Sequence, residues 1–436
     1  MTSIVTLFVG WAVCGWVAAS ASLATPPVSA RSVDASVRPI VDALGGVDIL
    51  GFGQAAHGAR ESTSVAGRVF RALAARRGYT VFAIEAGWGD AHGIDRFVQG
   101  ESGDVGRLLR EQGEWIWNTA ELRDIIVWMR AYNRTRGKHP ALHFAGVDIE
   151  RADSSLRVVE RYVRKRGGAF ASALSADLSC GYGIVIETYV ASRTKAQRDR
   201  CAASLVRARS VLEHGPADPG RDEERKIALH ALQIAIESQR LASAVPRPGE
   251  RGAKAAAAFT AAFNIRDAAM AENAIWEAHR WNGRVVLLAH DQHVAREGLA
   301  TARGASGPVL RVMGSVLAAS LRTRYYALGQ TFARGEIMAK PARTPERPPQ
   351  RMRADPDPDD DTASLSSSRT GATFIDLRTL EPASPAGRWA TTQHWIRDAG
   401  SVFDPERSLE PYVLARAFDG IVSFPVVHPV RLLPAR

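Results

Sequence analysis

The sequence contains little cysteine, little lysine and no long apolar run beyond its first 30 residues. Only three Cys occur in 436 residues, which excludes a disulfide-dense scaffold. After residue 30 no apolar run reaches the roughly 18 to 20 residues that cross a bilayer. With 46% hydrophobic and 23% charged residues, the chain has the composition of a folded globular protein, and its length suggests two or three domains.

The basic charge of the chain is spread along the sequence. Lys and Arg number 56 against 46 Asp and Glu, and all but six of these cations are Arg. The Arg residues form no stripe interleaved with aromatic residues, so a nucleic-acid-binding surface is not indicated. The net charge of +10 favours attraction to anionic surfaces. We therefore expect no nucleic-acid partner.

The N-terminus has the pattern of an export signal. Residues 4–19 are apolar, and Ala19-Ser20-Ala21 offers the small residues that a signal peptidase accepts, which predicts cleavage after Ala21. No Lys or Arg precedes the apolar run, so a retained membrane anchor is the alternative. Export predicts a periplasmic or secreted protein with no integral membrane span after signal cleavage.

Two cysteines remain after the predicted cleavage. Cys180 and Cys201 are an even number that an oxidising compartment can pair. Two free buried thiols are the alternative, because the count alone does not decide between them.

Short apolar runs alternate with amphipathic helical patterns, which is typical of an α/β fold with a central, mostly parallel sheet. Val65, Val69, Phe70 and Leu73 share one helical face, and Thr119 is placed to cap a second helix that carries Leu122, Ile125, Ile126, Met129 and Tyr132. The predicted strands are Ile49–Gly53, Val81–Glu85, Leu142–Asp148, Arg284–Ala289, Val309–Met313, Thr373–Leu377 and Gly420–Phe424.

The chain divides by composition into four parts. Residues 1–30 are the signal peptide and linker, and residues 31–153 are the first part of the α/β core. Residues 154–278 show long helical patterns without a strand, which predicts an inserted helical cap subdomain. Residues 279–436 are the second part of the core. Within them Pro, Asp and Ser crowd into residues 341–370, which we expect to form a disordered loop.

Ionisable side chains lie at the ends of four predicted strands. His57 follows the first strand, Glu85 and Asp148 end the second and third, and His290 and His293 follow the fourth. Because ligands of a parallel sheet bind beyond the carboxyl ends of its strands, we expect these side chains to converge. Each alone is compatible with a structural role. Burying several ionisable groups together is costly, which favours a polar active site.

Four segments carry a resemblance to the erythromycin esterase-like family, which includes macrolide esterases and succinoglycan biosynthesis-type homologues. Gly53 to Glu61 resembles the family's G-E-x-x-H-G-x-x-E segment, and Ala289 to Val294 resembles A-H-N-x-H-V. Phe82 to Asp90 and Arg266 to Asn273 are similar to two further family segments, and all four stand in family order.

The resemblance implies an α/β fold with a helical cap and a hydrolase whose partner is a small-molecule ester substrate, an ester or a lactone that it cleaves with activated water. By position, His57 matches the general base and Glu85 the carboxylate that supports it. His290 and His293 match a second histidine pair, which the chemistry of acyl transfer can use to stabilise an oxyanion.

Four further residues are candidates for substrate binding: Gln54, Arg60, Glu61 and Asp148. Arg60 and Glu61 flank the histidine motif and are expected to hold its loop by pairing, with an anionic substrate group as the alternative partner of Arg60. Gln54 stands where the family pattern has Glu, and an amide cannot ionise.

We predict no cofactor and no metal, and two alternatives stay open. His57, Glu85, His290 and His293 have the ligand types of a metal-dependent hydrolase. Because Gln54 replaces the family Glu, a non-catalytic protein that binds a glycoside or polyketide is the other alternative. The absence of a G-x-S-x-G segment disfavours a serine nucleophile.

Overall fold

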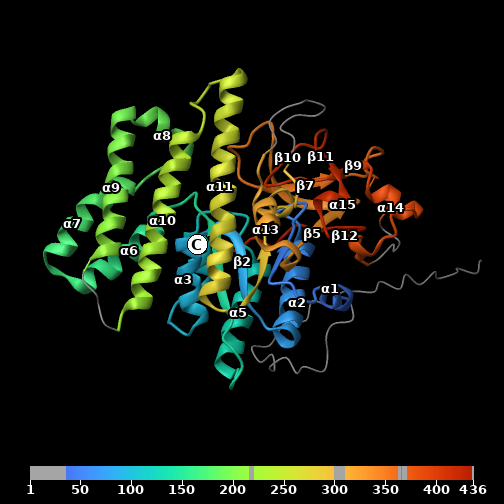
Figure 1. The fold of residues 1–436 in the computed structure, drawn as a ribbon. Helices are drawn as coiled ribbons and strands as arrows, with labels where there is room; N and C mark the ends of the chain where they lie inside the picture. Colours follow the sequence, from blue (N-terminus) through green and yellow to red (C-terminus); the bar gives the residue numbers. More distant parts are fainter. Residues whose placement is uncertain (1–35, 216–219, 299–309, 362–364, 366–370, 435–436) are drawn as a thin grey trace, which may run out of the picture.

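The computed structural model describes residues 36–215, 220–298, 310–361, 365 and 371–434, and a seven-stranded sheet lies at its centre (Figure 1). The strand order is β3-β2-β4-β1-β5-β12-β8, and only β8 runs antiparallel to its neighbour. Its strands are β1 (Ile49–Phe52), β2 (Tyr79–Gly87), β3 (His143–Asp148), β4 (Arg284–Leu288), β5 (Tyr325–Phe332), β8 (Thr373–Asp376) and β12 (Gly420–Phe424).

Two smaller sheets accompany the central one in the described residues. They are formed by β10 (Val402–Phe403), β6 (Gly335–Pro341) and β7 (Gln350–Ala354), and by β11 (Leu409–Val413) and β9 (Gln393–Arg397). The helices are α1 (Arg38–Ala43), α2 (Arg60–Arg77), α3 (Trp88–Val98), α4 (Val105–Glu111), α5 (Ala120–Thr135), α6 (Asp153–Arg166), α7 (Gly168–Leu178), α8 (Ile186–Ser192), α9 (Lys195–His214), α10 (Asp222–Ala244), α11 (Gly252–Arg280), α12 (Asp291–Val294), α13 (Met313–Leu321), α14 (Pro385–Ala390) and α15 (Leu414–Ala417).

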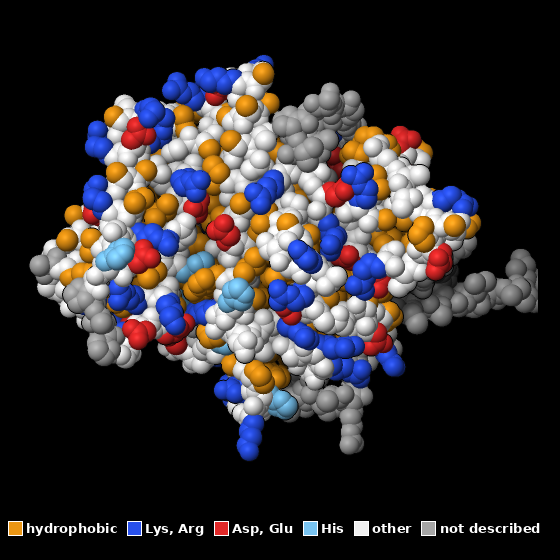
Figure 2. Space-filling model, viewed as in Figure 1, with side chains coloured by type: hydrophobic (Ala, Val, Ile, Leu, Met, Phe, Trp, Pro, Cys, Tyr) orange, Lys and Arg blue, Asp and Glu red, His pale blue; other side chains and the backbone are white. Residues whose placement is uncertain are grey.

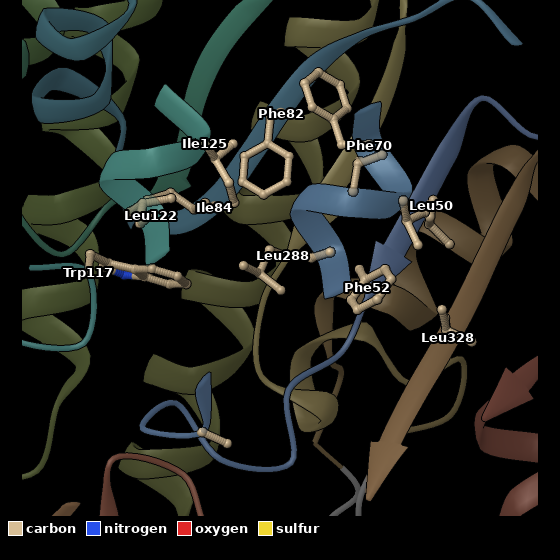
Figure 3. Close-up of a cluster of buried hydrophobic side chains, with 14 of the residues drawn as sticks. Leu50, Phe52, Phe70, Phe82, Ile84, Trp117, Leu122, Ile125, Leu288 and Leu328 are labelled. Carbon is tan, nitrogen blue, oxygen red and sulfur yellow. The ribbon is translucent and has the colours of Figure 1, made fainter. Parts of the chain in front are cut away.

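Alternating residues of the strands build a hydrophobic core on each face of the sheet. On one face Leu50, Phe82 and Leu288 pack with residues of α2 and α5 (Figure 3). On the other face their neighbours Ile49 and Leu287 pack with residues of α11 and α13. Because both faces are covered, the strands read as continuous apolar runs, and this is why the sequence indicates them.

Helices α6 to α11 form the part of the fold predicted as helical, and they contain no strand in the described residues 153–280. They pack around their own hydrophobic cluster, which includes Leu156, Leu205 and Leu232, beside the sheet (Figure 1). The disulfide between Cys180 and Cys201 joins the segment after α7 to α9, so the predicted pairing is present.

The strand predicted at Val309–Met313 is wrong. Residues 310–312 have no regular structure, Met313 begins α13, and Val309 lies outside the described residues. The backbone here is held by side chains of α11, because Asn264 accepts from the amide of Arg311 and Asp267 from that of Met313. The strand that joins the sheet is β5, between β1 and β12, which the strand predictions had omitted.

The expectation of a disordered loop over residues 341–370 is wrong for its first half. Residues 350–354 form β7, which pairs antiparallel with β6. Ala354 is buried, and Met352 packs against the main core, so pairing and burial order this segment despite its composition. Residues 362–364 and 366–370 lie outside the described residues.

The predicted signal peptide also lies outside the described residues. A search of the described helices finds none that is both long enough and apolar enough to cross a membrane. On the face in Figure 2, Lys and Arg side chains are spread out with Asp and Glu among them, in line with the scattered charge of the sequence.

Removal of the disulfide should destabilise the protein. The bond closes a sequence separation of 21 residues, which the chain-entropy model values at about 3 kcal/mol. The double variant Cys180→Ser/Cys201→Ser should lose about this much free energy of unfolding in urea titrations. Reductant should lower the free energy of unfolding of the natural protein to the same value. Equal stability with and without the bond would contradict the prediction.

Candidate active site

Three neighbouring strands bring the predicted catalytic residues to one edge of the sheet. Strand β4 lies between β2 and β1, so the carboxyl ends of all three strands are adjacent. His57 follows β1, Glu85 lies near the end of β2, and His290 and His293 follow β4. All four residues are buried, with exposed fractions of 7%, 7%, 9% and 5%. The convergence expected from the sequence is therefore present.

Gln54 fixes the orientation of the His57 ring. The side-chain oxygen of Gln54 lies 3.1 Å from Nδ1 of His57, and because an amide oxygen only accepts, Nδ1 carries the proton. The amide nitrogen of Gln54 in turn donates to Thr63 (3.4 Å). Burial lowers the pKa of His57 from 6.5 to about 4, against the opposing charge of Glu85. At neutral pH His57 is thus a neutral imidazole with an unprotonated Nε2, the form that a general base needs.

His293 has the opposite charge state. Its Nδ1 lies 2.8 Å from Asp267 and its Nε2 lies 3.2 Å from Glu85, so both ring nitrogens donate to carboxylates. Burial alone would lower the pKa of His293, but Asp267 and Glu85 outweigh burial and raise it to about 10. His293 is therefore an imidazolium whose two N–H groups are already engaged, and it acts on its surroundings through charge.

Glu85 connects the histidines to Arg266 of α11. One carboxylate oxygen contacts His293 and Arg266 (3.1 Å), and the other accepts from the backbone amide of His290 (2.9 Å). Burial would raise the pKa of Glu85, but the charges of His293 and Arg266 hold it well below its usual value. The His57 ring donates its hydrogen bond to Gln54, so Glu85 acts on His57 by charge across space.

The other three substrate-binding candidates make structural contacts. Asp148 accepts from Nε of Arg266 at 3.1 Å and orients the guanidinium beside Glu85. Arg60 contacts Glu121 (3.6 Å), and Glu61 accepts from the backbone amide (2.9 Å) and ring (2.8 Å) of His428. The expectation that Arg60 and Glu61 pair to hold the motif loop agrees with these contacts.

Several residues of the site were not assigned a role from the sequence. Arg266 and Asp267 entered only as part of a family segment, although Asp267 has buried apolar neighbours such as Ala269 and Met270 on α11, and a charge among buried residues needs partners. Trp117, which donates to the carbonyl of Glu85 (2.7 Å), also packs edge-on against His57. Asp398 contacts His290 at 2.5 Å and lies in a segment without any motif.

The contacts of the predicted site residues bear on the metal-site alternative. In the part of the chain that the structure describes, no three or more His, Cys, Asp or Glu side chains are grouped so that they could hold a metal ion. Both ring nitrogens of His293 are engaged with carboxylates, which removes it as a ligand unless these contacts break.

The α/β sheet presents a buried neutral histidine and a second, charged histidine at its carboxyl edge, an arrangement whose chemistry suits acid–base catalysis. Residues 74–427 match the family model described as erythromycin esterase, and the chain belongs to this family. Family membership indicates a hydrolase. The family and the fold class predicted from the sequence are confirmed.

Individual relatives show more limited similarity. A stretch of 120 residues is 25% identical to the erythromycin esterase type II of Escherichia coli, and the match spans only 27% of each protein. A solved structure of a succinoglycan biosynthesis protein has a TM-score of 0.77 at 18% identity, over 94% of this chain and 95% of that one.

Two further solved structures share the fold. A Bacillus cereus protein has a TM-score of 0.76 at 21% identity, with coverage of 91% of this chain and 93% of its own. A mutant of the erythromycin esterase EreC in its open conformation has a TM-score of 0.64 at 15% identity, over 92% of this chain and 96% of that one.

Replacing Gln54 by an acid should change the pH dependence of the site. With a pKa of about 4 for His57, the acidic limb of kcat/KM should lie near pH 4 in the natural protein. Gln54→Glu places a negative charge on the existing hydrogen bond, which raises the pKa of His57 and should move this limb upward by about one to two pH units. Gln197→Glu, which adds the same charge on exposed α9, should leave the limb unchanged. An unmoved limb in Gln54→Glu would refute this role of Gln54.

Loss of the Asp267 charge should destabilise the fold in a pH-dependent way. The raised pKa of His293 contributes stability that is fully present below its ordinary value of 6.5 and is lost as the pH rises through about 10. Asp267→Asn should therefore cost about 3–5 kcal/mol at pH 6.5, and this difference should shrink towards pH 10 in urea unfolding series. Asp199→Asn, which breaks the exposed pair with Lys195, should cost less than about 1 kcal/mol at every pH. A loss of unfolding free energy in Asp267→Asn that is the same at every pH would contradict the charged state assigned to His293.

Proposed function

We propose that this chain is an exported hydrolase that cleaves an ester or lactone with water activated by His57. The observation that carries the proposal is the hydrogen bond from His57 Nδ1 to Gln54, which leaves Nε2 unprotonated. In the proposed reaction Nε2 takes a proton from water as the hydroxide oxygen attacks the carbonyl carbon. The His57 imidazolium then returns this proton to the departing alkoxide, so the site is regenerated.

The charges around His57 support this role. Taking a proton turns His57 into a cation, and the nearby carboxylates of Glu85 and Asp398 favour that charge while His290 and His293 oppose it. Burial, with the opposition of these two histidines, keeps His57 neutral between turnovers, and the carboxylates reduce the cost of charging it. His57 is therefore unprotonated at rest, and it can accept a proton at the moment when the water attacks.

Export and substrate class are the finer parts of the proposal. The apolar segment at residues 4–19 and the disulfide both fit an oxidising compartment such as the periplasm or the extracellular space. The names of the relatives direct attention to macrolide lactones. A screen of macrolides and simple aryl esters with purified mature protein, read by mass spectrometry for the gain of one water, tests both substrate classes.

The alternative of a binding protein rests on Gln54. An amide keeps the hydrogen bond to His57 but removes the charge that the family Glu would supply. Tight binding of a glycoside or polyketide without any product in the mass spectrum would favour this alternative over hydrolysis.

The His57→Asn variant should lose hydrolysis while remaining folded. General-base catalysis contributes roughly 100- to 10,000-fold, and Asn cannot accept the proton from water. The expected loss in kcat is therefore at least about 100-fold, with an unchanged circular dichroism spectrum. His428→Asn is the matched control, since His428 is exposed and pairs with Glu61 at the surface. Activity retained in His57→Asn, on an ester that the natural protein cleaves, would exclude His57 as the base.

A further inference from the structure

The segment that follows β9 completes the site from the C-terminal part of the chain. The backbone amide of Ala399 donates to the carbonyl of Ala55 (2.6 Å), and the amide of His57 donates to the carbonyl of Gly400 (3.3 Å). The amide of Gly400 lies 3.1 Å from Nε2 of His290. This segment therefore contacts the backbone of one site histidine and the ring of the other.

Asp398 begins this segment and is held on two sides. Its Oδ1 lies 2.5 Å from Nε2 of His290, and its Oδ2 accepts from the hydroxyl of Tyr412 at 2.7 Å. Its backbone amide donates to the carbonyl of Ser408 across the β9–β11 hairpin. The side chain is only 3% exposed, so its position is fixed by these contacts and not by solvent.

A second carboxyl group and a phenol lie around Asp398. Burial, followed by the neighbouring Asp398, raises the pKa of Asp291 at the start of α12 well above its usual value. Burial and Asp398 likewise raise the pKa of Tyr412 on β11, whose hydroxyl donates to Asp398. The ring centroid of His57 lies 5.1 Å from that of His290.

The location of Asp291 is itself enforced by packing. A Cβ on Gly53 would lie 1.7 Å from Oδ1 of Asp291, so only glycine allows this approach. The backbone amide of Gln330 on β5 donates to both carboxyl oxygens of Asp291. Asp291 is thus held under the site with its own partners, and Asp398 is the carboxylate left to contact His290.

We propose that Asp398, held by Tyr412, is a positioning residue that fixes the ring of His290 beside His57. Asp398 acts through His290 and has no proposed contact with substrate. The consequence for turnover rests on the proposed hydrolytic function, whereas the effect on His290 does not. The C-terminal hairpin thereby supplies a part of the site that no local motif marks.

The effect on His290 is tested by NMR with ¹⁵N-labelled histidine, using His290→Gln to assign its signals. Asp398→Asn replaces the carboxylate that contacts Nε2 of His290, so the ¹⁵N signal of Nε2 should change. Tyr412→Phe removes the hydroxyl that donates to Asp398, so it should also change the His290 ring signals, even if Asp398→Asn fails to fold. Unchanged His290 ring signals in both variants would overturn the proposal.

The effect on turnover is tested on an ester that the natural protein cleaves. Asp398→Asn should lower kcat by about 10-fold or more with little change in KM, and Asp398→Glu should restore part of it. Asp361→Asn is the matched control, because Asp361 contacts the ring of His394 and the backbone amide of Trp395 in the same hairpin, both at 3.1 Å, and it should leave kcat unchanged. A kcat that is insensitive to Asp398→Asn would overturn the catalytic part. If the natural protein cleaves no ester, the proposed function fails, and the NMR signals alone decide on the positioning of His290.

Discussion

The charged His293, held between Asp267 and Glu85, is the interaction on which the site depends. It joins three elements that are distant in sequence: Asp267 belongs to α11, Glu85 to β2, and His293 to the turn after β4. A buried imidazolium is stable only when its charge is matched, so the three side chains must assemble together or not at all. Arg266, next to Asp267 on α11, extends the same network to Glu85 and Asp148, which fixes the long helix α11 over the end of the sheet.

Partners, and not residue type, determine what each histidine does. His57 and His293 are equally buried, yet an amide oxygen leaves the first neutral and two carboxylates make the second a cation. Gln54 is central to this difference. It preserves the hydrogen bond that orients His57 but withholds negative charge, so the base remains unprotonated to a lower pH than a carboxylate would allow. The exchange of Glu for Gln therefore preserves the geometry of a general base and weakens its proton affinity.

The sequence is informative where the structure depends on local pattern. The strands Ile49–Phe52 and Arg284–Leu288 are largely apolar runs, and His57, His290 and His293 follow within a few residues, so the edge that carries the candidate site was predictable. An apolar run by itself does not distinguish a strand from the residues that precede a helix. Val309–Met313 is as apolar as a strand, but side chains of α11 hold its described backbone. Asp398 was beyond prediction for a different reason: it reaches His290 through the pairing of β9 with β11, a tertiary contact 108 residues along the chain from its partner.

Contacts between distant parts of the chain can enclose a charged pair more completely than contacts within one exposed loop. Exposed loops offer water as a competing partner for every charge, whereas residues that come from separate elements can enclose a charged pair on all sides. Asp267, which contacts His293, comes from α11, and Asp398, which contacts His290, comes from the segment after β9. Each of these two histidines thus contacts a carboxylate from outside the sheet, and His293 also contacts Glu85 of β2. The carboxylates and the histidines come from different parts of the fold. The charge state of the site therefore depends on the correct packing of both α11 and the C-terminal hairpin on the sheet.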